Sequence, residues 1–283
     1  MIEYKEFGKT KVKVSAIGMG TFFDMPAIIK SRILGHHKNE PQKVAALKKG
    51  IELGINLIDT AEVYNTETIV AKAIKDFKRD ELFIATKVYP LHLRYNQVLK
   101  AAQRSISKLQ TSYIDLYQVH VPNPFIPIKE TMKAMEKLVD EGRIRYIGVS
   151  NFSLSGLVKA EEALSKHEIT SIQNAYSLAE RKFEEGLLPY CSQKNIAVLP
   201  YRPLEHGKLA RPSPQTEKVL DEISQKYGGK TPAQITLNWL LTKNKNVFPI
   251  PRASNPERVI ENIGAMGWNL EPEEITNLEN AVS

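Results

Sequence analysis

The chain has little cysteine and no long apolar segment. Cys191 is the single cysteine among 283 residues, so no internal disulfide can form and no cluster of thiolates is available to bind zinc. The N-terminus carries charge from its third residue and lacks the apolar centre of a signal peptide. Nowhere do about 18 apolar residues follow one another, as a membrane-spanning helix requires. These absences predict a reduced, soluble and cytoplasmic protein without a metal site.

The chain also lacks a block of like charge. Its formal net charge is +7, but 39 Lys and Arg residues are interspersed with 32 acidic residues. A basic stripe with interleaved aromatic residues, which a nucleic-acid-binding groove would require, is missing. The pattern is typical of a solvated surface with room for one local site for an anionic ligand. We therefore expect neither a nucleic-acid partner nor a membrane partner.

Short apolar runs alternate with helical patterns along the whole chain. Eight such runs occur, at residues 16–20, 56–60, 82–88, 113–120, 145–151, 171–176, 197–201 and 247–251. The stretches between them place apolar residues at helical spacing. Strands that alternate with helices in this way predict a parallel sheet with right-handed crossovers, and eight units are the number that closes a TIM barrel. An open, doubly wound sheet is the main alternative.

Two missing features argue against the open sheet. The first strand-to-helix turn, GMGT at 18–21, does not contain the G-x-G-x-x-G of a dinucleotide-binding fold. A linker rich in Gly, Ser or Pro is also missing, so we expect residues 1–283 to form a single domain. We predict an α/β fold, a (β/α)8 TIM barrel with a short N-terminal β-hairpin near residues 11–14 and an extra C-terminal helix that begins at Pro272.

Two connections are longer than a minimal barrel needs. They cover residues 22–40, after the first predicted strand, and residues 205–215, after the seventh. Both should lie on the C-terminal face, where barrel loops form active sites. The first contains His36 and His37, which we expect to be solvated, and we expect the same of Glu62 in the loop after the second strand.

Ionisable side chains follow three consecutive predicted strands. Asp59 ends NLID with Tyr64 five residues later, Lys87 ends LFIATK, and His120 ends YIDLYQVH. Each residue alone has an ordinary explanation as a turn former, a packing residue, a solvated lysine or a satisfied polar histidine. Because the strand ends of a barrel meet at one face, however, all four should converge on one mouth.

The chemistry of these four residue types indicates proton transfer. A tyrosine with its ordinary pKa of about 10 exchanges protons poorly near neutral pH. A buried Lys87 would lower the pKa of Tyr64 by favouring the phenolate, and Asp59 would keep that lysine charged. His120 could orient a substrate carbonyl group. The set holds no metal ligands and no obvious nucleophile, so carbonyl reduction here would need a hydride carrier.

The second half of the chain has polar residues that suit such a carrier. Ser150 and Asn151 end the fifth predicted strand and Gln173 lies in the sixth, where a hydroxyl and two amides could bind a carboxamide. Tyr201 ends the seventh strand and could stack on a flat ring.

A candidate anion site follows the eighth predicted strand. A helix should begin at Pro256, and its N-terminus together with two guanidinium groups would attract an anion. The residues concerned are Arg252, Ser254, Asn255 and Arg258, with Ser254 or Asn255 as the cap. An ordinary capped helix with exposed arginines is the alternative.

Seven motifs now define a resemblance over essentially the whole chain. They are, in order, IDTAEVY, ATKV, DLYQVH, GVSNF, IQNAYS, YRPL and IPRASNPERVIEN. In these motifs the chain resembles the aldo-keto reductases, barrel enzymes that reduce carbonyl groups with NADPH. The resemblance implies that Asp59, Tyr64, Lys87 and His120 form a catalytic tetrad. It also implies that Tyr64 protonates the carbonyl oxygen of an aldehyde or ketone, sugar-like compounds included.

The resemblance also implies a set of contacts to NADP(H). Ser150, Asn151 and Gln173 would bind the carboxamide, Tyr201 would stack on the nicotinamide, and residues 202–209 would line the pyrophosphate. Two arginines beside the adenosine 2'-phosphate would favour NADPH over NADH. The full set is Ser150, Asn151, Gln173, Tyr201, Arg202, Leu204, Gly207, Leu209, Ile250, Arg252, Ser254, Asn255, Arg258, Glu261 and Asn262.

Departures from the family pattern affect the turn and the substrate pocket. Asn65 stands where a glycine commonly follows the tetrad tyrosine, and asparagine tolerates the left-handed conformation such a turn needs. Val121 and Asn123 follow His120 in place of the usual aromatic or acidic pocket residues. The same fold also serves as a nicotinamide-binding regulatory or redox-sensing subunit of larger complexes, which is the alternative function. We expect a monomer or a small homo-oligomer.

Overall fold

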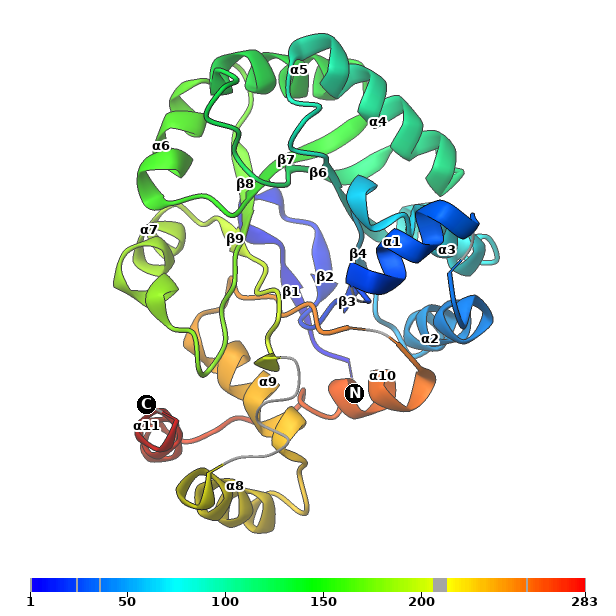
Figure 1. The fold of residues 1–283 in the computed structure, drawn as a ribbon. Coiled ribbons are helices and arrows are strands. Elements are labelled where there is room, and N and C mark those ends of the chain that lie inside the picture. The colour runs from blue at the N-terminus through cyan, green and yellow to red at the C-terminus, as the bar shows by residue number, and fades with distance from the viewer. Residues whose placement is uncertain (1, 24, 36, 206–212, 253, 283) are drawn as a thin grey trace.

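Seven parallel strands form the centre of the molecule. The computed structural model describes residues 2–23, 25–35, 37–205, 213–252 and 254–282 (Figure 1). Each strand pairs with the next one along the chain, so the sheet order follows the sequence. The strands are β3 (Met19–Gly20), β4 (Leu57–Asp59), β5 (Phe83–Val88), β6 (Ile114–Val119), β7 (Ile144–Ser150), β8 (Ile169–Gln173) and β9 (Ala197–Val198).

The eighth predicted strand closes the barrel without forming a regular strand. Within residues 247–252, the amide of Phe248 donates to the carbonyl of Val198 at 2.8 Å, and the carbonyl of Pro251 accepts from the amide of Gly20 at 2.9 Å. This segment therefore bonds to both β9 and β3. Pro249 and Pro251 have no N–H group. Their carbonyl groups accept hydrogen bonds from β3 and its preceding residue Gly18, but these two residues donate none in return. The predicted (β/α)8 barrel is confirmed, with its last strand reduced to isolated bridges.

Helices surround the strands as a ring (Figure 1). They follow the predicted order, and the predicted C-terminal helix is confirmed as α11. After the first long connection the helices are α2 (Glu40–Glu52), α3 (Glu67–Ile74), α4 (Tyr95–Leu109), α5 (Ile128–Asp140), α6 (Leu154–Glu162), α7 (Leu187–Gln193), α8 (Pro214–Lys226), α9 (Pro232–Lys243), α10 (Pro256–Ile263) and α11 (Pro272–Ala281). Short 3₁₀ turns are η1 (Gly8–Thr10), η2 (Glu62–Tyr64), η3 (Arg79–Glu81) and η4 (Lys182–Glu185). Within the described residues, no helix is both long and apolar enough to cross a membrane.

The long first connection contains a helix that the sequence pattern did not predict. This helix, α1 (Met25–Leu34), lies between β3 and α2. Ile28 is buried, but Ile29 and Leu34 are more than half exposed. Because the apolar residues of its sequence, MPAIIKSRIL, do not gather on one helical face, periodicity gave no signal there.

The predicted N-terminal hairpin covers the N-terminal end of the barrel. β1 (Tyr4–Glu6) pairs antiparallel with β2 (Lys13–Ser15). Phe7, which is fully buried, reaches into the barrel and contacts the rings of Phe83 and Phe248 at centroid distances of 4.7 and 5.2 Å. The centre of the barrel is therefore filled with aromatic side chains at this end.

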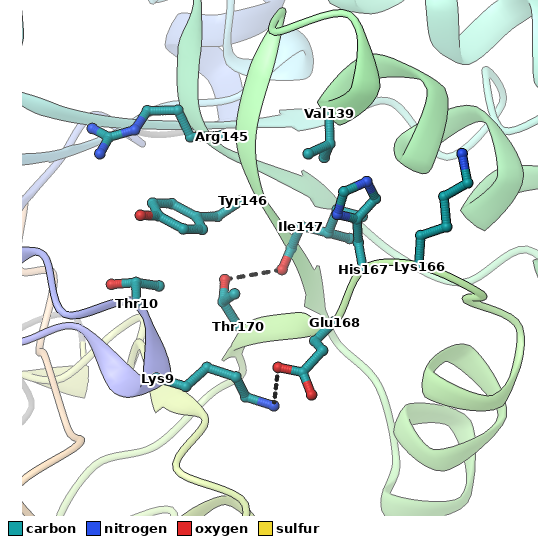
Figure 2. A pocket seen from close by; sticks show the side chains of 10 residues that line it. All are labelled: Lys9, Thr10, Val139, Arg145, Tyr146, Ile147, Lys166, His167, Glu168 and Thr170. Atoms are coloured by element: carbon teal, nitrogen blue, oxygen red, sulfur yellow. Dashed lines mark hydrogen bonds and ion pairs between the residues drawn. The ribbon is translucent and has the colours of Figure 1, made fainter.

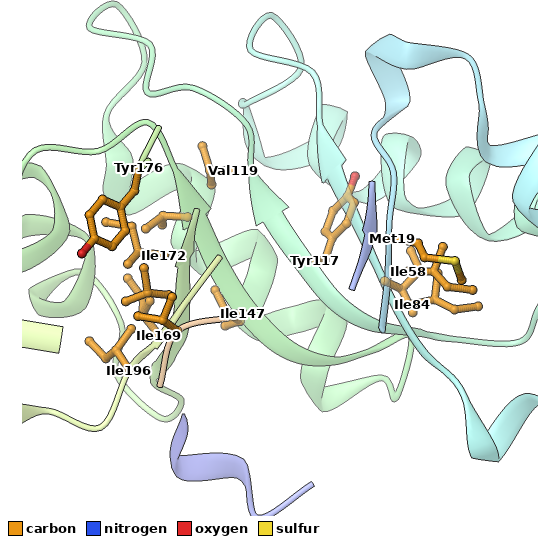
Figure 3. Packing of buried hydrophobic residues seen from close by; sticks show 14 of the residues in the cluster. Met19, Ile58, Ile84, Tyr117, Val119, Ile147, Ile169, Ile172, Tyr176 and Ile196 are labelled. Carbon is orange, nitrogen blue, oxygen red and sulfur yellow. The ribbon is translucent and has the colours of Figure 1, made fainter. Parts of the chain in front are cut away.

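Alternation along each strand decides which side chains face the barrel interior. Leu57, Phe83 and Leu116 belong to the inner cluster, whereas Ile58 and Ile84 pack against the helices (Figure 3). Since side chains of a strand alternate between faces, the inner set continues toward the C-terminal ends of β4, β5 and β6. The residues at those ends are Asp59, Lys87, Gln118 and His120.

Candidate active site

A cavity of about 690 Å³ opens at the C-terminal face of the barrel. Residues from the ends of nearly every strand line it. Those predicted from the sequence are Asp59, Tyr64, His120, Ser150, Asn151, Gln173, Tyr201, Arg202, Leu204, Ile250, Arg252, Arg258, Glu261 and Asn262. Apolar and aromatic residues that were not predicted as site residues complete one wall, namely Phe22, Phe23, Val63, Tyr89, Pro90 and Val121.

The four predicted catalytic residues meet at the floor of this cavity. The ammonium group of Lys87, fully buried, donates to a carboxylate oxygen of Asp59 at 2.6 Å and to the carbonyl of Thr60 at 2.8 Å. It also lies 5.0 Å from the centre of the Tyr64 ring. The phenol oxygen of Tyr64 lies 3.4 Å from Nε2 of His120. The predicted convergence of the four side chains is therefore present.

The protonation of Tyr64 differs from the sequence-based expectation. Burial, followed by the negative charge of Asp59, raises the pKa of the Tyr64 phenol above its usual range, whereas a lowered pKa was expected. The physical reason is that burial disfavours the charged phenolate, and that Asp59 places a negative charge near the phenol. Burial also lowers the pKa of Lys87, and Asp59 opposes that effect. Tyr64 thus holds its proton near neutral pH.

His120 is neutral in this environment. Burial, together with repulsion from the nearby Lys87 ammonium, lowers the pKa of His120 to about 3. Its Nδ1 atom is buried and has no hydrogen-bond partner among the described residues. A neutral imidazole can still donate one hydrogen bond from Nε2, toward the side of the ring where Tyr64 lies.

The lowered pKa of His120 should make folding stability depend on pH. In the unfolded chain this histidine takes up a proton below about pH 6.5, whereas in the folded protein it stays neutral down to a pKa of about 3. Stability should therefore fall as the pH decreases through this window, by about 1.4 kcal/mol per pH unit. Between pH 7.5 and pH 5 the wild type should lose about 2 kcal/mol more than His120→Gln, as measured by urea denaturation. Equal losses in the two proteins would contradict a neutral His120.

The turn that presents Tyr64 has a left-handed residue and a cluster of hydroxyl groups. Asn65 has φ 58°, as the sequence-based argument for this position required. Directly after it, the hydroxyl of Thr66 contacts those of Thr21 and Thr60 at 2.8 and 2.9 Å. These contacts hold the start of α3 against the ends of β3 and β4.

Two residues near this turn were wrongly predicted to be solvated. His37 is only 4% exposed, and its Nε2 lies 2.9 Å from the carbonyl oxygen of Asn65. The side chain of Glu62 is 11% exposed and accepts hydrogen bonds from the neighbouring β5–α4 loop and from α4. Both residues are buried by segments distant in the sequence, which a local pattern does not reveal. His36 lies outside the described residues.

The residues predicted to bind a carboxamide line the cavity and bond to the catalytic residues and to Tyr201. Gln173 donates to Asp59 at 2.8 Å, and Tyr201 donates through its hydroxyl to Asn151 at 2.7 Å. Asn151 in turn donates to the carbonyl of His120 at 2.8 Å. Gln118, a buried residue of β6 that was not predicted, lies 3.5 Å from Asp59. Its position two residues before His120, on the same face of the strand, was the signal that could have identified it.

The predicted helix start at the far end of the cavity is confirmed. Asn255 caps α10 by accepting from the amide of Arg258 at 2.9 Å, and Pro256 is the first helical residue. Arg252 and Arg258 are exposed and line the cavity, and Arg252 also donates to the carbonyl of Phe23 at 2.6 Å. Ser254 and Asn255 belong to this turn but do not line the cavity among the described residues.

The segment between β9 and α8 is described in part. Arg202 and Leu204 line the cavity, and Ile250 does so from the segment that closes the barrel. Gly207 and Leu209, also predicted to contact the cofactor, lie outside the described residues.

A second cavity, of about 380 Å³, lies near the N-terminal ends of β7 and β8. Figure 2 shows four basic side chains around it, those of Lys9, Arg145, Lys166 and His167. Lys9 pairs with Glu168 at 3.2 Å, and the other three pair with aspartates nearby. Because these basic side chains are already paired with carboxylates, we take the cavity at the opposite end of the barrel as the candidate active site.

Known proteins are similar to this chain in both sequence and fold. The model of the aldo/keto reductase family matches residues 16–283. The chain is 33% identical to aldo-keto reductase YhdN of Bacillus subtilis (strain 168), with 100% of this chain and 95% of that protein covered. It is 32% identical to methylglyoxal reductase YeaE of Escherichia coli (strain K12), with 95% and 92% covered. The crystal structure of an aldo/keto reductase from Klebsiella pneumoniae in complex with NADP and acetate matches with a TM-score of 0.85 and 34% identity, covering 99% of this chain and 95% of that one. This chain therefore belongs to the aldo-keto reductase family.

Proposed function

We propose that this protein is an NADPH-dependent carbonyl reductase that converts an aldehyde or ketone, sugar-like compounds included, to an alcohol. One observation carries the proposal. The Tyr64 hydroxyl and Nε2 of His120 lie 3.4 Å apart at the floor of the cavity, where both can reach one carbonyl oxygen. The relatives support this reaction, since one is named a methylglyoxal reductase and another was solved with NADP.

The residues along the cavity fit the proposed cofactor. The cavity runs from Tyr64 to the N-terminus of α10, where two arginines and a capped helix start favour a phosphate group. We propose that Arg252 and Arg258 bind the 2'-phosphate, that Arg202 lies near the pyrophosphate, and that Tyr201 stacks on the nicotinamide. The remaining predicted contacts stay part of this proposal. NADPH, when bound, supplies the hydride.

The protein's own contribution is proton delivery and orientation. Tyr64 keeps its proton because burial and Asp59 raise its pKa. As negative charge develops on the carbonyl oxygen, that oxygen becomes a stronger base than a phenolate, so the proton moves from Tyr64 to it. The Lys87 ammonium, 5.0 Å from the ring centre, then stabilises the phenolate that is left. Neutral His120 donates a hydrogen bond to the same oxygen and fixes its direction.

The alternative function, a nicotinamide-binding regulatory subunit, is not supported by the relatives reported above, which are named as reductases. We also propose that residues 1–283 act as one catalytic domain. The oligomeric state, a monomer or a small homo-oligomer, stays a prediction.

An assay with purified protein tests the proposed function. The protein should oxidise NADPH in the presence of a reactive aromatic aldehyde such as nitrobenzaldehyde, because the apolar wall of the cavity accepts the ring while Tyr64 and His120 act on the carbonyl oxygen. The absorbance of NADPH measures turnover, and NADH under the same conditions measures nucleotide preference. Binding of NADPH without turnover across a broad panel of carbonyl compounds would contradict the proposal.

A further inference from the structure

We propose that Glu62 is a positioning residue that fixes Tyr64 relative to the substrate wall of the cavity. The inference rests on the function proposed above, because its effect is measured on carbonyl reduction. Glu62 opens the η2 turn, and Tyr64 closes it two residues later. Any shift of the Glu62 carboxylate is therefore transmitted to the proton donor over a very short length of backbone.

Three donors, two from the loop after β5 and one from α4, hold this carboxylate. One oxygen of Glu62 accepts from the backbone amide of Tyr89 at 2.9 Å. The other accepts from Nη2 of Arg104 at 2.9 Å, and Nδ1 of His92 lies 3.0 Å from it. The turn after β4 is thus joined to the loop after β5 and to α4.

The same contacts connect Glu62 to the wall of the cavity. Tyr89 and Pro90 follow β5 directly, two and three residues beyond Lys87, and both line the cavity. The carbonyl of Pro90 accepts from the side chain of Asn123 at 3.1 Å, in the loop that follows His120. Two hydrogen bonds, joined through the backbone of Tyr89 and Pro90, therefore connect the turn that carries Tyr64 with the loop beyond His120.

The contacts require a carboxylate. Burial acts to raise the pKa of Glu62, but hydrogen bonds from Arg104, the Tyr89 amide and His92 outweigh it, and the pKa is lowered. The ionised group accepts through both oxygens. A glutamine would present an NH₂ group to one of the donors, so at least one of the contacts would be lost.

The expected consequence is a loss of turnover with little loss of cofactor binding. A displacement of a reacting group by about 1 Å can lower the rate about 100-fold. Arg252 and Arg258, which we propose bind the 2'-phosphate, make none of these contacts, and the hydrogen bond of Arg252 goes to the carbonyl of Phe23. Proton transfer should slow while binding of NADPH is retained.

Glu62→Gln tests the inference against a matched control, Glu136→Gln. Glu136 also accepts several hydrogen bonds, including those from the amides of Ser165 and Lys166 at 2.7 and 2.6 Å. It ties α5 to the loop before β8, at the N-terminal end of the barrel, away from the active site. A general loss of stability should therefore appear in both variants, whereas an effect on catalysis should appear only in the first.

We expect kcat for aldehyde reduction to fall about 10-fold to 100-fold in Glu62→Gln, with the Kd for NADPH within twofold of wild type. The solvent deuterium isotope effect on kcat should increase, because proton transfer becomes slower relative to other steps. In Glu136→Gln, Tm should fall by about as much as it does in Glu62→Gln, while kcat stays within twofold of wild type.

Three results would overturn the inference, and the first two are an unchanged kcat in folded Glu62→Gln and an equal loss of kcat in Glu136→Gln. Arg104→Ala is a second variant, which removes one of the three donors. Because the side chain of Arg104 is 48% exposed, this variant should fold. We expect a smaller reduction of kcat, about threefold to tenfold, and an unchanged kcat there would also overturn the inference. A wild-type protein that reduces no carbonyl compound would instead contradict the proposed function, so the two failures are distinguishable.

Discussion

Replacing Tyr64 by phenylalanine should lower kcat for aldehyde reduction about 1000-fold, within the range that general acid catalysis contributes. The variant removes only the hydroxyl group, which lies 3.4 Å from His120 and is the proton donor in the proposed reaction. The ring should stay in place, since its contact with Phe22, at a centroid distance of 5.1 Å, does not need the hydroxyl. Binding of NADPH should therefore remain within twofold of wild type.

Steady-state turnover and a fluorescence titration with NADPH measure the two quantities separately. Tyr190→Phe is a suitable control, because it also removes a hydrogen-bonded hydroxyl. The hydroxyl of Tyr190, in α7, donates to Glu161 of α6 at 2.6 Å. Its kcat should match that of the wild type. Activity retained in Tyr64→Phe would mean that another group protonates the substrate.

Replacing both Arg252 and Arg258 by alanine should weaken NADPH binding about 100-fold and change NADH binding less than threefold. Hydrogen bonds to a charged group contribute about 1.5 kcal/mol or more each, and two of them account for the expected factor. NADH has no 2'-phosphate, so it should not sense the loss. Arg252 also donates to the carbonyl of Phe23, so its loss can change the cavity wall and weaken the binding of both nucleotides. The ratio of the two Kd values therefore tests the prediction better than either value alone.

The Kd values of the double variant for both nucleotides, measured under the same salt conditions, test this prediction. Arg143→Ala, an arginine near the N-terminal ends of the strands, serves as the control and should leave both affinities unchanged. An equal loss for NADPH and NADH would place the 2'-phosphate at another site.

The fold and the four central residues could be predicted because the signals for them are local. Alternation along a strand identifies its inner face, and polar residues at the ends of parallel strands must meet at one face of the barrel. Asp59, Lys87 and His120 each carried this signal. The cap of α10 at Asn255 was also predictable, because a capping residue and a proline at the first helical position are sequence features.

The charge states and the second layer of contacts could not be predicted in the same way. The pKa of Tyr64 was expected to fall because of Lys87, but it rises because of burial and Asp59, and only the three-dimensional arrangement weighs these effects. Glu62 and His37 were expected to be solvated, yet they bond to segments about 30 residues away in the chain. Helix α1 lacks one apolar stripe, so periodicity could not reveal it.

The most direct test of the central claim is the transfer of deuterium to an aldehyde from NADPH that carries deuterium in place of both hydrogens at the nicotinamide C4 position. Mass spectrometry of the alcohol formed by the wild type should show one deuterium on the carbon that was the carbonyl carbon, and Tyr64→Phe should form about 1000-fold less of this product in the same time. An alcohol without the label, or equal amounts of labelled alcohol from the two proteins, would contradict the assignment of this cavity as a carbonyl reductase site with Tyr64 as its acid.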